Sequence, residues 1–198
     1  MNFRRGKQMI VYDTGLSELG GGYQQSQVVT PPVAYRRWVL HPRNTAPWIL
    51  RRVAMVAAET KGGLDAVHFM GHGRPGYIQL GRGALDDSTL PAFRELRGNA
   101  RVIVFFSCQV GGEHQGAGGW IRGQPPTFAR GIVEATDAKV VVALENQRYR
   151  VGANGVIDFG AWDGPVDVYE PGGVISSHQA HDPFRTTRQF DLEQVIFG

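Results

Sequence analysis

The sequence contains very little cysteine, since Cys108 is the only one in 198 residues. A single cysteine cannot form an internal disulfide, so nothing in the sequence calls for an oxidising compartment. The sequence also lacks any apolar stretch close to the roughly 20 residues that span a membrane. The apolar stretch after the basic N-terminal residues, at 9–12, is too short for the core of a signal peptide. We therefore expect a cytoplasmic protein with no membrane segment.

An excess of charge of one sign is also missing. The sequence has 21 Lys and Arg against 18 Asp and Glu, a formal net charge of +3. The densest basic pairs are Arg36 with Arg37 and Arg51 with Arg52. Solvated faces of a strand and a helix explain such pairs better than a nucleic-acid site does, so we expect no nucleic-acid partner. With 42% hydrophobic residues and no internal repeat, the composition indicates one globular domain over residues 1–198.

Strand-like and helix-like segments alternate from about residue 7 to residue 144. Strands are expected at residues 7–13, 33–40, 66–70, 77–80, 101–107 and 139–144. Helices are expected from a cap at Asn44 or Thr45 to the glycines at 62–63, over 86–97, and over 127–137. The alternation predicts an α/β fold, a mostly parallel sheet flanked by helices on both faces in a three-layer α/β/α arrangement. Short apolar segments in the last fifty residues predict small β hairpins near the C-terminus.

Two of the expected strands each end in a residue that can do chemistry. The apolar run 101–107 ends at Cys108, before Gly111 and Gly112, and the run 64–70 ends just before His72 and Gly73. The carboxyl ends of neighbouring parallel strands meet at one edge of the sheet. The sequence therefore predicts a cysteine nucleophile and its imidazole base side by side.

These residue types fit acyl transfer through a covalent intermediate. A thiolate is the nucleophilic form of cysteine, and an imidazole within hydrogen-bond reach can lower the thiol pKa from about 8.5 to roughly 3.5–7.5. His72 can then return the proton to the leaving amine. The backbone amide of Gly73 can donate to the tetrahedral oxygen with no side chain in the way. The sequence thus indicates Cys108, His72 and Gly73 as catalytic residues.

Other sites fit the pattern less well. An α/β-hydrolase elbow needs glycine two residues before and after the nucleophile, where this chain has Phe106 and Val110. Papain-like enzymes have the cysteine before the histidine, the reverse of the order here. His68 and His72 would be about 13 Å apart on an extended strand, too far to share a metal with Cys108. We predict no metal site and no cofactor.

Three segments resemble a known group of enzymes. These are residues 71–81 (GHGRPGYIQLG), 103–108 (IVFFSC) and 135–142 (ATDAKVVV). In order, spacing and flanking apolar runs they are similar to the caspase-like cysteine peptidases of clan CD, above all to bacterial caspase-like domains, over residues 64–145. The resemblance implies a caspase-haemoglobinase fold and a dyad of Cys108 and His72 that needs no third acid.

The substrate-binding residues depart from the family pattern. Metacaspases carry Asp two residues before the cysteine to bind a basic P1 residue, and this chain has Phe106 there. Asp13 and Glu145 end two other expected strands, so either could take over this role for a Lys or Arg at P1. Ser107, directly before the cysteine, is the third candidate substrate-binding residue.

The resulting hypothesis is a cysteine endopeptidase that acts on a protein or peptide and has a possible regulatory protein partner. Two alternatives stay open: a catalytically inactive caspase-like interaction module, or an acyl or amide hydrolase of small molecules. The segment 111–126 contains six glycines and the bond between Arg122 and Gly123. We expect it to be an exposed loop that could be cleaved in regulation.

Overall fold

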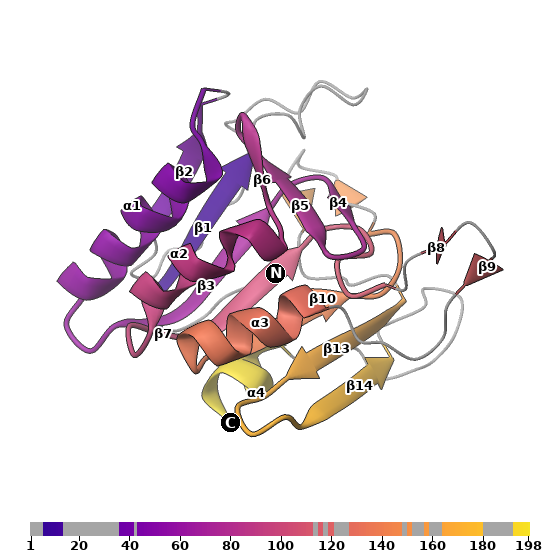
Figure 1. Cartoon of the computed structure of the whole chain (residues 1–198). Coiled ribbons are helices and arrows are strands. Elements are labelled where there is room, and N and C mark those ends of the chain that lie inside the picture. Colours follow the sequence, from indigo (N-terminus) through magenta and orange to yellow (C-terminus); the bar gives the residue numbers. More distant parts are fainter. Residues whose placement is uncertain are drawn as a thin grey trace.

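The computed structural model describes residues 6–13, 36–41, 43–112, 115–116, 119–120, 127–147, 150–151, 157–158, 164–179 and 192–198. Its centre is a sheet of seven strands: β1 (Gln8–Asp13), β2 (Arg36–Leu40), β3 (Leu64–Met70), β7 (Ala100–Phe106), β10 (Lys139–Ala143), β13 (Pro165–Tyr169) and β14 (Ile175–Gln179). Their order across the sheet is β14-β13-β10-β7-β3-β1-β2 (Figure 1). The strands from β2 to β10 are parallel, and β13 and β14 join antiparallel. No helix of the described residues is long and apolar enough to cross a membrane.

The central strands form where the sequence has continuous apolar runs. β3, β7 and β10 are buried along almost their whole length, as is typical of parallel strands covered on both sides. β3 and β7 pair from Leu64 opposite Ala100 to Met70 opposite Phe106. The two strands that carry the predicted dyad are therefore direct neighbours that end at the same level.

Three helices lie on one face of the sheet (Figure 1). They are α1 (Ala46–Glu59), α2 (Leu90–Phe93) and α3 (Thr127–Thr136). The helix expected over 86–97 is a short α2 between two 3₁₀ turns, of which the first is capped by Asp86. α1 begins after Thr45 with a proline in its first turn, as expected.

A cluster of phenylalanines joins this helical layer to β3 and β7. The rings of Phe69 and Phe105 stack with centroids 5.5 Å apart, and Phe93 of α2 and Phe128 of α3 pack against Phe105 at 6.5 and 5.6 Å. All four side chains are buried. The cluster fixes the two central strands relative to each other and to the helices.

The expected fold class is wrong. The sheet is mixed, with an antiparallel C-terminal edge, and a separate antiparallel sheet is formed by β4 (Gly73–Arg74), β5 (Tyr77–Leu80) and β6 (Gly83–Leu85). The described residues contain only four helices, and on the second face of the sheet the only one is the six-residue α4 (Leu192–Phe197), through Leu192 and Ile196. Helices on both faces in a three-layer sandwich are therefore not what the described chain forms.

The direction of the strand crossovers explains this difference. From β2 the chain moves past β1 to β3, then to β7 and then to β10, always in the same direction across the sheet. Parallel crossovers are right-handed, so successive crossovers in one direction place their helices on the same face. Alternation of strands and helices along the sequence does not reveal this direction.

Two short strand pairs complete the described structure: β8 (Gln115–Gly116) with β9 (Gly119–Trp120), and β11 (Arg150–Val151) with β12 (Ile157–Asp158). Of the segment 111–126, residues 111–112 and the strands β8 and β9 are described. Arg122 lies outside the described residues, so cleavage after it stays a prediction.

Candidate functional site

Cys108 lies in the turn that follows β7. Every residue from Val102 to Ser107 is buried, whereas Cys108 is half-buried. Its Sγ accepts a hydrogen bond from the backbone N–H of Gln147 at 3.4 Å, and the thiol can donate to the Gln147 carbonyl at 3.7 Å. The sulfur therefore lies at the rim of the sheet, beside the segment that follows β10.

The backbone turns sharply directly after Cys108. Gln109 has a φ of 54°, in the left-handed region that a residue other than glycine seldom occupies. Its carbonyl accepts from the N–H of Gly112 at 2.8 Å, and its N–H donates to the carbonyl of Glu145 at 2.9 Å. Unfavourable backbone conformations of this kind persist where the surroundings determine them, and they are frequent at functional sites.

His72 lies at the corresponding point of the next strand. Met70 pairs with Phe106 in the β3–β7 register, and His72 and Cys108 each follow that pair by two residues. His72 is half-buried, and its carbonyl accepts from the N–H of Gln79 of β5 at 2.7 Å. The pairing of the two strands that precede His72 and Cys108 is confirmed. The catalytic role of the two residues stays a prediction.

Gly73 is in direct contact with the Cys108 turn. A Cβ at position 73 would be 2.3 Å from the Cys108 carbonyl oxygen and 2.8 Å from Ser107 Cβ, so only glycine fits. In an antiparallel ladder, pairs that exchange hydrogen bonds alternate with pairs that exchange none. His72 and Gln79 are a hydrogen-bonded pair, so the next pair, Gly73 and Ile78, exchanges no hydrogen bonds. The Gly73 N–H is thus not used in the β4–β5 ladder.

Ser107 is completely buried beneath this contact. Its Oγ has no hydrogen-bond partner in the described part of the chain. A peptide substrate at the rim cannot touch a side chain with no exposed surface. The Ser107 side chain therefore lies below the site surface, next to Gly73, where a substrate does not reach it.

The two candidate specificity acids lie in different places. Asp13 ends β1, which is two strands away from β7, and its buried carboxylate accepts from the Gly81 N–H at 2.6 Å. Glu145 is exposed and follows β10, the other neighbour of β7. In the pairing of β10 with β7, Val142 lies opposite Phe105. Three residues further along both strands, Glu145 is opposite Cys108. The backbone of Glu145 is thus near the candidate nucleophile, and its carboxylate lies against Gly164, just before β13. Asp13 lies two strands away from Cys108.

His68 belongs to the interior and not to the site. It is buried, its Nε2 lies 2.7 Å from Gln8 Oε1, and burial lowers the pKa of its imidazole to about 3. His178 pairs with Ser176 Oγ at 3.0 Å, far along the chain on β14, and His181 lies outside the described residues. Within the described ranges no group of three or more His, Cys, Asp or Glu side chains could hold a metal ion.

Two features of the structure were not found from the sequence. Gln147 contacts the sulfur through its backbone, which leaves no signal in the residue type. A cavity of about 190 Å³ opens between α3 and the β13–β14 turn, where Arg130, Glu134, Tyr169 and Val174 line it. None of the candidate site residues lines this cavity, so it gives no support to the chemistry at Cys108.

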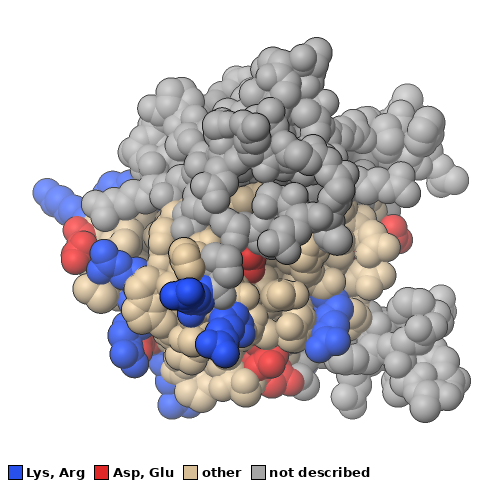
Figure 2. All heavy atoms as spheres, turned by 90° about the horizontal axis from the view of Figure 1, so that it is seen from above, with Lys and Arg blue, Asp and Glu red and all other residues tan. Residues whose placement is uncertain are grey.

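The basic side chains do not gather into one patch on the face drawn in Figure 2. The Lys and Arg spheres lie at several separate places, with Asp and Glu spheres between some of them. The expectation that nucleic acid is not a partner stays a prediction.

Comparison with known proteins links only the central part of the chain to a family. No curated protein matches the chain. The matched part, residues 45–142, runs from the start of α1 into β10 and includes His72, Gly73 and Cys108, whereas Asp13 and Glu145 lie outside it. Over these residues the chain is similar to a family described as a domain of unknown function (DUF4347).

Proposed function

We propose that this protein is a cysteine endopeptidase related to the caspase-like cysteine peptidases, with Cys108 as nucleophile and His72 as general acid and base. The observation that carries the proposal is the contact between the two strand-end turns. Gly73 touches the backbone of Cys108, and His72 precedes Gly73 directly in the chain. A nucleophile and a base at neighbouring strand ends are the elements that covalent acyl transfer requires.

In the proposed reaction the Cys108 thiolate attacks the carbonyl carbon of the scissile bond and forms a C–S bond. The Gly73 N–H donates to the oxygen on which negative charge develops. His72, protonated by the thiol, gives its proton to the leaving nitrogen as the C–N bond breaks. Water then attacks the thioester, with His72 taking its proton, and the C–S bond breaks to release the acid and return the thiol.

The single thiol of the chain also fits a reducing compartment, so we place the proposed enzyme in the cytoplasm. Its substrates are proteins or peptides, and a regulatory protein partner is compatible with the site. Glu145, exposed beside the nucleophile, is the residue we assign to a basic P1 side chain.

Single substitutions test the dyad. Cys108→Ala and His72→Ala should each lower peptide turnover by at least about a thousandfold, because each removes a group without which the acyl transfer cannot proceed. Both side chains lie half-exposed at the rim, so thermal unfolding should change little. Turnover of a fluorogenic peptide library, with circular dichroism as the folding control, measures both.

Three outcomes separate the hypotheses. Near-full turnover by Cys108→Ala would show that the dyad assignment is wrong. A wild-type protein that cleaves no peptide and whose thiol reacts with a peptidyl acyloxymethylketone as slowly as an ordinary thiol would indicate an inactive interaction module. A fast-reacting thiol with turnover of small amides alone would favour the small-molecule hydrolase.

A further inference from the structure

The hairpin between β4 and β5 carries a cation to the edge of the candidate site. Residues 74–77 read Arg-Pro-Gly-Tyr. Pro75 fixes its φ near −65°, and Gly76 has a φ of 65°, the combination of a type II turn. Such a turn brings its first and fourth residues together, and Arg74 lies opposite Tyr77 in the register.

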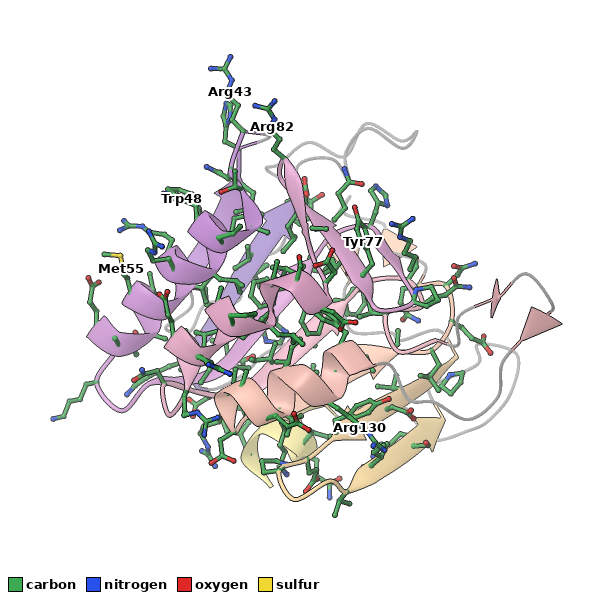
Figure 3. The ribbon with its side chains drawn as sticks, in the orientation of Figure 1. Arg43, Trp48, Met55, Tyr77, Arg82 and Arg130 are labelled. Atoms are coloured by element: carbon green, nitrogen blue, oxygen red, sulfur yellow. The ribbon has the colours of Figure 1, made fainter. Side chains whose placement is uncertain are left out.

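The Arg74 side chain is held in place by the Tyr77 ring. The guanidinium carbon lies 4.2 Å from the ring centroid, a cation–π contact, and Figure 3 shows Tyr77 projecting from β5. Arg74 is exposed, and the ion pairs within the described residues join other partners, Arg101 with Asp65 and Lys139 with Glu170. Stacking uses the face of the guanidinium and leaves its in-plane N–H groups able to bind a carboxylate in a bidentate manner.

The same hairpin is attached to the Cys108 turn at two points. At its start Gly73 touches the Cys108 carbonyl, and at its tip the Gly76 N–H donates to the Val110 carbonyl at 3.0 Å. Arg74 is therefore one residue from the contact with Cys108 and two residues from His72. The fold thus places the backbone of Arg74 beside the Cys108 turn, on the His72 side, and the guanidinium lies against the Tyr77 ring.

We propose that the Arg74–Tyr77 pair is a binding site for a substrate carboxylate on the leaving-group side of the scissile bond. The choice of side rests on the proposed function, because a general acid must face the nitrogen that leaves. The carboxylate is either an Asp or Glu side chain just after the scissile bond or the free C-terminus of a short peptide. With Glu145 on the opposite side of Cys108, the site would select substrates that change from basic to acidic across the cleaved bond.

The single cysteine allows a test that needs no peptidase activity. Iodoacetate is an anion and iodoacetamide is neutral, and both alkylate the same thiolate. The ratio of their two rates is therefore independent of the fraction of ionised thiol, and it reports the electrostatic potential at the sulfur. Arg74→Met should lower the iodoacetate to iodoacetamide ratio about two- to fivefold at low ionic strength, and added salt should shrink the difference. Arg82→Met is the matched control, because Arg82 is an exposed arginine at the far end of β5 (Figure 3). Equal ratios in the two variants would overturn the proposal.

Peptide cleavage tests the ligand and its source. Peptides with Glu or Gln at the first or second position after the scissile bond, each with a free or an amidated C-terminus, separate the two carboxylates. We expect kcat/KM to be about tenfold higher with the carboxylate present, an advantage that Arg74→Met removes and Arg82→Met keeps. Equal kcat/KM for all four peptide types would overturn the proposal while leaving the peptidase assignment intact. A lower alkylation ratio in Arg74→Met, together with no cleavage of any peptide, would support the carboxylate site and count against the peptidase.

Discussion

Gly73 is the residue at which the two halves of the candidate site meet, and no side chain fits there. An added methyl would overlap backbone atoms of Cys108 and the Cβ of the buried Ser107, and backbone atoms cannot move away cheaply. We expect Gly73→Ala to lower the free energy of unfolding by about 1–3 kcal/mol. The Cys108 alkylation rate should change at least several-fold, because the Cys108 backbone must shift. Urea unfolding and iodoacetamide kinetics measure the two effects.

Gly83→Ala is the control for this substitution. Gly83 also begins a strand of the small antiparallel sheet, but its added Cβ would come no closer than 3.3 Å to any atom, the nitrogen of Ala46. Its effect on both measurements should be smaller. Equal effects of the two substitutions would show that the contact between Gly73 and Cys108 does not constrain the site.

Glu145 and Asp13 are both acids at strand ends, but their surroundings differ. Glu145→Gln should reduce cleavage after Lys and Arg about tenfold relative to cleavage after Gln, because a charged partner is lost at the P1 side chain. Asp13→Asn should leave the P1 preference unchanged and lower stability, because its carboxylate holds the Gly81 N–H. Profiling of a P1 peptide library on the three proteins checks this. A wild-type preference for Asp, Leu or a small residue would contradict the role of Glu145.

At the scale of elements, β1 and β3 are joined by a buried polar pair within their apolar strands. His68 of β3 bonds Gln8 of β1, and burial lowers the His68 pKa from 6.5 to about 3. In the unfolded chain His68 takes up a proton near pH 6.5, whereas in the folded protein it stays neutral until about pH 3. Protons therefore favour the unfolded state between these values. The contribution of His68 is complete above pH 6.5 and is lost as the pH falls, by at most ~1.4 kcal/mol per pH unit.

This linkage predicts a difference between the wild type and His68→Gln, whose side chain does not titrate. Between pH 6.5 and pH 5 the wild type should lose about 2 kcal/mol more of its free energy of unfolding than the variant does. Urea unfolding of both proteins at several pH values in this window measures the difference. Parallel pH profiles would show that His68 is not a neutral, buried imidazole.

Packing between elements also holds the two strands that precede the proposed catalytic residues. β3 and β7 are neighbours whose Phe69 and Phe105 rings stack, and α2 and α3 each add one ring to the cluster. Phenylalanine side chains bury large apolar areas, so contacts between them contribute strongly to the stability of the folded protein. His72 and Cys108 therefore stand at the ends of two strands that cannot slide past one another without breaking this cluster.

At the scale of the whole molecule, the candidate site occupies the middle of the sheet and the middle of the chain. The matched family region, residues 45–142, supplies α1 to α3 and the dyad residues, while β1 and the antiparallel edge of β13 and β14 lie outside it. Glu145 and Gln147 come from the segment between β10 and that edge. The proposed catalytic residues thus belong to the matched region, and the proposed P1 contact belongs to the part that follows it.

The sequence by itself determined the strands and the residues at their ends. Continuous apolar runs ending at Cys108 and before His72 are local patterns, and parallel strands align such ends, so the neighbouring positions of both residues could be predicted. Only the tertiary structure decided the rest, because it depends on which strands become neighbours and on the direction of each crossover. The helices lie mainly on one face because successive crossovers run the same way. Asp13 and Glu145 look alike in the sequence, yet the strand order separates one from the site and brings the other to it.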